Sequence, residues 1–175
     1  MRLIKEKIIT DENAKVDMFS NLFASCFYIG YFPKASGTFG SLFGVLFFLF
    51  EDFKRPEILL PSIIICFIAG IYTSKVMMKR FGDDPSVVVI DEVVGMWITV
   101  MVYLFFSKGE YGIYTLILLF FFFRFFDIVK IQPAKYYDNS KTAFGVMMDD
   151  VIAGIYAGLS AFALVYIASV IITHT

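Results

Sequence analysis

Long apolar runs are the feature that most constrains how this chain can fold. Val87–Phe106 gives 20 mostly apolar residues, which as a helix would extend about 30 Å, the thickness of the hydrocarbon core of a bilayer. A second segment, Gly112–Lys130, contains two leucines followed by four phenylalanines in a row. Backbone polar groups in lipid need partners within the protein, so runs of this kind must be helical. The sequence therefore predicts membrane helices.

The composition supports a membrane protein over a soluble one. Hydrophobic residues make up 59% of the chain and charged residues only 18%, against about 45–50% and about 25% in soluble domains. A length of 175 residues leaves room for one domain. Because 15 Lys and Arg nearly balance 16 Asp and Glu, no basic excess points to a nucleic acid partner.

The apolar segments define the expected architecture. Met18–Phe32 has only 15 residues, fewer than the roughly 20 that a crossing needs, and we interpret it as a short re-entrant or interfacial helix. The later segments are Gly37–Phe50, which is short, Ile58–Met78, Val87–Phe106, Gly112–Lys130 and Asp149–Ile172. We expect an all-α fold, a compact polytopic membrane bundle of about four transmembrane helices plus the short N-terminal helix. Residues 1–17 form a polar lead-in, and residues 18–175 form a single membrane-embedded domain.

The distribution of basic residues between the loops predicts the orientation. Eleven Lys and Arg residues fall in the loops on one side of the membrane and three on the other, while Arg124 lies inside a segment. Cytoplasmic loops carry the excess of Lys and Arg, so the N-terminus and the loop Ile131–Met148 are predicted to be cytoplasmic.

Charged residues inside the apolar segments are the candidate functional residues, because burying charge in a membrane is costly. With the predicted topology they all lie near the cytoplasmic ends of their helices. They are Asp91, Glu92, Arg124, Asp127, Lys130, Asp149 and Asp150.

Two adjacent acid pairs suggest a metal site. Neighbouring carboxylates repel each other unless a cation holds them, and Mg²⁺ is a natural partner because it takes oxygen ligands and completes its shell with water and substrate phosphate. The alternative is that these acids only complement helix ends. We take Asp91, Glu92, Asp149 and Asp150 as candidate metal ligands, and Asp91, Glu92, Asp127 and Asp150 as candidate catalytic carboxylates.

Other motifs favour a phosphate ligand. Arg124, Asp127 and Lys130 share a helical face, where Arg124 can grip phosphate with two donors and Lys130 supplies a point charge. A salt-bridged face would explain the same spacing. In the turn 37–41, Gly37, Thr38 and Ser41 are candidate substrate-binding residues, because the free N–H groups at a helix start bind anions. A helix cap followed by a packing glycine is the alternative.

The sequence lacks the nucleophiles of several known mechanisms of phosphate-ester hydrolysis. Neither cysteine begins the loop of thiol phosphatases, and the single histidine, His174, is far from the acids. Metal-assisted attack by water, with a carboxylate as base, remains. A transporter of ions or protons is the main competing hypothesis, but transporter sites lie near the bilayer midplane between repeats, and no repeat is visible here. A purely structural membrane subunit would leave the convergent acids unexplained.

Four motifs together resemble the phosphatidylglycerophosphatase A family of bacterial membrane lipid phosphatases. The motifs occupy residues 33–42 (PKASGTFGSL), 89–97 (VIDEVVGMW), 123–130 (FRFFDIVK) and 145–154 (GVMMDDVIAG). Ser36 and Ile131 depart from the family, which usually has proline at both positions.

The resemblance implies magnesium-dependent hydrolysis of phosphatidylglycerophosphate to phosphatidylglycerol and inorganic phosphate. It also implies a compact all-helical fold in the bacterial inner membrane and a phospholipid as the partner. With the loop charges, which predict a site on the cytoplasmic side, we expect residues 18–175 to form one phosphatase domain. The oligomeric state is left open.

Overall fold

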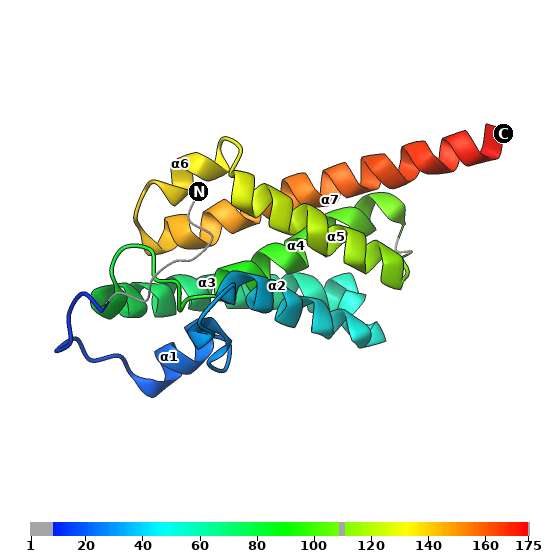
Figure 1. Cartoon of the computed structure of the whole chain (residues 1–175). Coiled ribbons are helices and arrows are strands. Elements are labelled where there is room, and N and C mark those ends of the chain that lie inside the picture. The colour runs from blue at the N-terminus through cyan, green and yellow to red at the C-terminus, as the bar shows by residue number, and fades with distance from the viewer. Residues whose placement is uncertain (1–8, 109–110, 175) are drawn as a thin grey trace.

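All regular structure that the computed structural model describes, in residues 9–108 and 111–174, is helical (Figure 1). The helices are α1 (Met18–Ala24), α2 (Ser36–Leu46), α3 (Pro56–Phe81), α4 (Ile90–Ser107), α5 (Ile113–Val129), α6 (Ala134–Asp138) and α7 (Ala143–His174), with 3₁₀ turns at Ile29–Tyr31, Phe47–Leu49 and Glu51–Lys54. The two described ranges contain no strand, which confirms the predicted all-α fold.

Three helices, α3, α4 and α7, are long and apolar enough to cross a membrane. Helix α5 is apolar and has 17 residues, and α2 is shorter still. The membrane bundle is confirmed, and a total of about four crossings stays a prediction. Helix α7 runs along the bundle, and its C-terminal part extends beyond the other helices (Figure 1).

Helix α7 starts six residues before the predicted segment Asp149–Ile172. The hydroxyl of Thr142 accepts a hydrogen bond from the backbone N–H of Gly145 at 3.0 Å, which satisfies a free donor at the start of the helix. The acid pair Asp149 and Asp150 therefore lies in the second turn of α7, where the helix already packs against its neighbours.

The N-terminal segment forms the short helix expected from its length. Asp17 caps α1 by accepting a hydrogen bond from the N–H of Ser20 at 2.8 Å. The helix ends after seven residues, and the chain then turns through three residues with left-handed backbone, Cys26 to Tyr28. Of the polar lead-in, residues 9–16 form no helix and are mostly exposed, and residues 1–8 lie outside the described residues.

Helix α4 lies at the centre of the bundle, where it packs against α2, α3, α5 and α7. Its residues 93–100 are buried. The indole N–H of Trp97 donates a hydrogen bond at 3.0 Å to the carbonyl of Gly44, in the last turn of α2. Carbonyl groups in the last turn of a helix need partners from outside it, and Trp97 provides one inside an apolar core.

Glycines allow α2 and α7 to approach α4 closely. A Cβ on Gly44 would lie 3.3 Å from Met96, and a Cβ on Gly158 would lie 2.7 Å from the carbonyl oxygen of Thr99. A Cβ on Gly154 would collide with the carbonyl oxygen of Gly95. The Gly40/Gly44 and Gly154/Gly158 pairs are therefore close-packing surfaces, as their spacing predicts.

The basic loops gather at one end of the bundle. Lys141, which follows α6, forms an ion pair with Asp83, which follows α3, at 3.6 Å. Thr10 donates a backbone hydrogen bond of 2.7 Å to the carbonyl of Arg80 at the same end. At the opposite end, Lys54 lies over the ring of Tyr111. The loops that the charge count assigns to one side therefore do lie together.

The crossing of α4 and α7 predicts an effect of side-chain volume at Gly154. Gly154→Val should lower the free energy of unfolding by about 1–3 kcal/mol, because the added atoms have no space beside the backbone of Gly95. Thermal unfolding in detergent measures this change. Gly112→Val is the matched control, since a Cβ there meets nothing within 4 Å. Equal melting temperatures for the two variants would contradict the packing account.

Candidate active site

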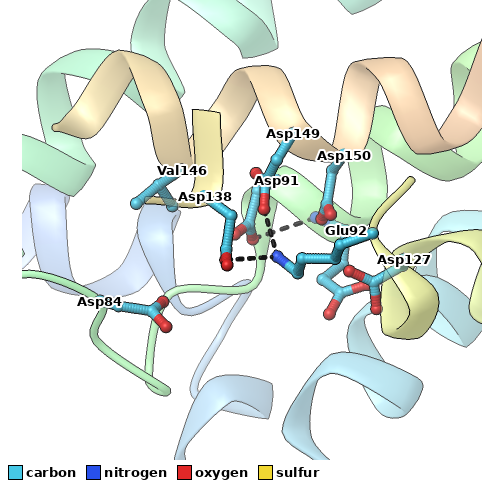
Figure 2. A pocket seen from close by; sticks show the side chains of 9 residues that line it. Asp84, Asp91, Glu92, Asp127, Asp138, Val146, Asp149 and Asp150 are labelled. Atoms are coloured by element: carbon cyan, nitrogen blue, oxygen red, sulfur yellow. Dashed lines mark hydrogen bonds and ion pairs between the residues drawn. The ribbon is translucent and has the colours of Figure 1, made fainter. Parts of the chain in front are cut away.

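Seven acids and one lysine surround a small cavity at the basic end of the bundle. The cavity holds about 40 Å³, which is space for a few water molecules or a partly hydrated ion. Its lining residues are Asp84, Asp91, Glu92, Asp127, Lys130, Asp138, Val146, Asp149 and Asp150. Figure 2 shows Glu92, Asp127 and Asp150 pointing toward a common space, with Asp84 set apart at the edge.

Three carboxylates from three helices lie close enough to share one cation. Glu92 of α4, Asp127 of α5 and Asp150 of α7 each offer an oxygen, and these oxygens all lie within 4.8 Å of one another. Ligands of Mg²⁺ lie 2.0–2.1 Å from the ion, so opposite ligand oxygens are about 4.2 Å apart. Asp150 is only 3% exposed and Asp127 8%. The group fits a divalent ion in size, chemistry and burial.

Only two of the four predicted metal ligands belong to this close group. Glu92 and Asp150 belong to the close group, and Asp127, expected as a catalytic carboxylate, joins them. Asp91 lines the cavity and accepts a hydrogen bond of 3.0 Å from the N–H of Glu92 in the first turn of α4. Asp149 pairs with Lys130, and its second oxygen, Oδ1, is buried without a hydrogen-bond partner. All five acids lie at one site, but only three form the close group.

Arg124 links three helices beside the cavity. Its Nη1 donates hydrogen bonds to Glu92 and, at 3.1 Å, to the hydroxyl of Ser41, and it forms an ion pair with Asp127 at 3.0 Å. The side chain of Arg124 is 15% exposed, so its charge is held largely inside the protein. Buried carboxylates are tolerated when they are paired in this way. Arg124 therefore pairs with two of the three close carboxylates and holds them in place.

The turn of α2 supports this network. The hydroxyl of Ser41 lies 3.0 Å from Glu92, and a Cβ on Gly37 would collide with the Glu92 carboxylate. The first turn of α2 is fixed next to α4 because Ser36 donates a hydrogen bond of 2.8 Å to the carbonyl of Ser86. Thr38 is half-buried and does not line the cavity. Of the three residues in this turn that were expected to bind substrate, Gly37 and Ser41 contact the acid network.

Lys130 follows α5 and reaches two acids on other elements. Its Nζ forms ion pairs with Asp149 of α7 and, at 2.7 Å, with Asp138 of α6. Burial alone would lower the pKa of Lys130, but the negative charges of Asp150, Asp149 and Asp127 outweigh burial and raise it. The ammonium group therefore stays charged at neutral pH.

Sequence reasoning missed two acids that line the cavity, Asp84 and Asp138. Both lie in polar connections, Asp84 in the link between α3 and α4 and Asp138 at the end of the short helix α6. Charged residues are common in loops, so their presence there does not indicate a functional site. The signal for Asp138 was indirect, since the charged segment that follows Lys130 had to fold back over the same end of the bundle.

Comparison with known proteins identifies the family. A sequence model of the family described as Phosphatidylglycerophosphatase A matches residues 22–165. The chain belongs to the phosphatidylglycerophosphatase A family. This family assignment confirms the resemblance carried by the four motifs, and it makes the chain an enzyme, a phosphatase. The transporter hypothesis has no comparable support.

Curated relatives carry two different substrate names. A Haemophilus influenzae protein named phosphatidylglycerophosphatase A is 34% identical over 83% of this chain and 88% of its own length. The Escherichia coli protein of the same name is 28% identical over 91% and 92%. A Bacteroides thetaiotaomicron protein named "Putative phosphatidylinositol-3-phosphatase" is 35% identical over 78% of this chain and 87% of its own length. No solved structure matches this chain.

Proposed function

We propose that this phosphatase hydrolyses phosphatidylglycerophosphate to phosphatidylglycerol and inorganic phosphate, with Mg²⁺ as its cofactor. The observation that carries the proposal is the close group of Glu92, Asp127 and Asp150 beside two cationic side chains. Two relatives named for this reaction support the choice of substrate. Membership of the family alone would not say which residues act.

The close group would hold the metal. A bound Mg²⁺ would supply positive charge to the phosphate and a site for water. These residues fit Mg²⁺ because the ion prefers oxygen ligands and three carboxylates lie within 4.8 Å of one another. The acids around the cavity also outnumber Arg124 and Lys130. Asp91 and Asp149 line the same cavity. They are candidates to act beside the metal without belonging to the close group that would bind it.

The chain's own residues would bind the phosphate and move the proton. Lys130 lines the cavity and offers a charged donor, and Arg124 holds Glu92 and Asp127 in position next to it. Attack by water would form a new P–O bond and break the bond to the glycerol oxygen, while a cavity carboxylate accepts the water proton and returns a proton to the departing glycerol oxygen. A thiol nucleophile is disfavoured, since burial raises the pKa of the Cys26 thiol and keeps it protonated.

A second substrate class, a phosphoinositide monophosphate, is favoured by one observation. The Bacteroides relative named for phosphatidylinositol 3-phosphate is 35% identical to this chain. Both candidate substrates are phosphate monoesters on the polar headgroup of a membrane lipid, so the same cavity chemistry serves either. Comparing kcat/KM for the two lipids in mixed micelles decides between them, and we expect phosphatidylglycerophosphate to be preferred.

The inner membrane and a cytoplasmic active site complete the proposal. The cavity lies at the end of the bundle where the basic loops meet, and such loops are normally cytoplasmic. The substrate phosphate would then be reached from the cytoplasmic headgroup layer.

Loss of a carboxylate from the close group should abolish turnover without unfolding the protein. Asp150→Asn should lower kcat/KM at least about 100-fold, because even an outer-sphere change at a metal site costs 10- to 100-fold. Phosphate release from phosphatidylglycerophosphate, measured across a Mg²⁺ titration together with the melting temperature, tests this. Asp83→Asn is the matched control, an exposed acid at the same end of the bundle. Wild-type turnover of Asp150→Asn at low Mg²⁺ would contradict the proposal.

Orientation can be tested by cysteine labelling in intact cells. In a background with Cys26 and Cys66 replaced, single cysteines at Lys34 and Lys135 should react only with a membrane-permeant reagent, and a cysteine at Lys54 should react with an impermeant one. The expected difference follows from the positive-inside rule. Labelling of the first two positions by the impermeant reagent would reverse the topology.

A further inference from the structure

The ammonium group of Lys130 is shared by two acids from different elements. Its Nζ lies 2.7 Å from Asp138 of α6 and also pairs with Asp149 of α7. A lysine ammonium has three N–H donors. The two acids occupy two of these donors, which leaves one donor for a ligand in the cavity that Lys130 lines.

The position of Asp138 is fixed by packing of α6 on α7. A Cβ on Gly145 would lie 2.5 Å from the carbonyl oxygen of Tyr137, so only a glycine lets α6 approach the first turn of α7 this closely. The ring of Tyr137 packs against Phe144 with ring centroids 6.0 Å apart. In the same connection, the hydroxyl of Tyr156 donates a hydrogen bond of 2.8 Å to the carbonyl of Gln132. Asp138 therefore lies on a helix, α6, whose position is fixed by its packing against α7.

Lys130 itself needs such support. It caps the C-terminus of α5 with a left-handed backbone at φ 48°. Its long side chain has many rotamers, which must be restricted before the charge is fixed in one place. Asp149 alone provides one anchor, about which the ammonium group can still turn. A second anchor on a different element removes that freedom.

We propose that Asp138 is a positioning residue that orients the ammonium group of Lys130 toward the substrate phosphate. The inference rests on the proposed function, in which Lys130 binds the phosphate. Asp138 lies outside the close group Glu92, Asp127 and Asp150, and its side chain is 33% exposed, so it acts on the lysine and does not belong to the metal-binding group. It is the acid through which the connection between α5 and α7 contributes to the reaction.

A double-mutant cycle with Lys130 tests the inference. Asp138→Ala should lower kcat/KM for phosphatidylglycerophosphate about 10-fold, as loss of an outer orienting partner does at comparable sites. Asp138→Asn keeps an acceptor for Nζ and should recover most of the loss. In a Lys130→Met background, Asp138→Ala should cause no further decrease, because the group it positions is gone. The Mg²⁺ concentration for half-maximal activity should stay unchanged.

Asp83→Ala is the control, since its ion pair with Lys141 at the same end is exposed and contributes little. Equal losses from Asp138→Ala in the wild-type and Lys130→Met backgrounds would overturn the inference. An Asp138→Asn variant as impaired as Asp138→Ala, with a raised Mg²⁺ requirement, would also overturn it and make Asp138 a metal ligand. If the wild-type protein does not hydrolyse the lipid at all, the proposed function fails instead, so the two failures are distinguishable.

Discussion

The close contact of α4 with α7 is the constraint on which the site depends. Gly154 lies against the backbone of Gly95, and a Cβ on Gly95 would lie 2.8 Å from the carbonyl oxygen of Asp150. With a larger residue at either position, the two helices would separate and carry Asp150 away from the acids of α4. The small residues thus do more than pack the membrane core, because they set the distance between carboxylates that are far apart in the sequence.

Charge pairing then determines what the site can hold. Arg124 and Lys130 balance part of the negative charge, each by contacting two acids from different elements. Seven acids but only one lysine line the cavity, so the proposed bound cation would balance more of this negative charge. A phosphate group would meet the cation and the lysine at the same place. The same balance explains why an otherwise apolar protein gathers acids at one end.

The sequence predicted the helical membrane fold and the location of the site better than it predicted the connections within it. Asp91, Glu92 and Asp150 stood out because charges inside apolar helices are costly. Asp127 was expected beside Arg124 from its spacing, but its place next to Asp150 depends on how α5 packs on α7, which no local pattern encodes. Asp138 was missed because its partner is eight residues away across a bend. The start of α7 was missed because Thr142 and Gly145 resemble loop residues.

Direct location of a metal ion is the most decisive measurement. Crystals of the wild-type protein grown with Mn²⁺ and a non-hydrolysable phosphonate analogue of the substrate would give an anomalous difference signal at each bound ion. The account predicts a peak within coordination distance of Glu92, Asp127 and Asp150, with the phosphonate between that peak and Lys130. A peak elsewhere, or an analogue bound away from Lys130 in protein that hydrolyses the lipid, would contradict it.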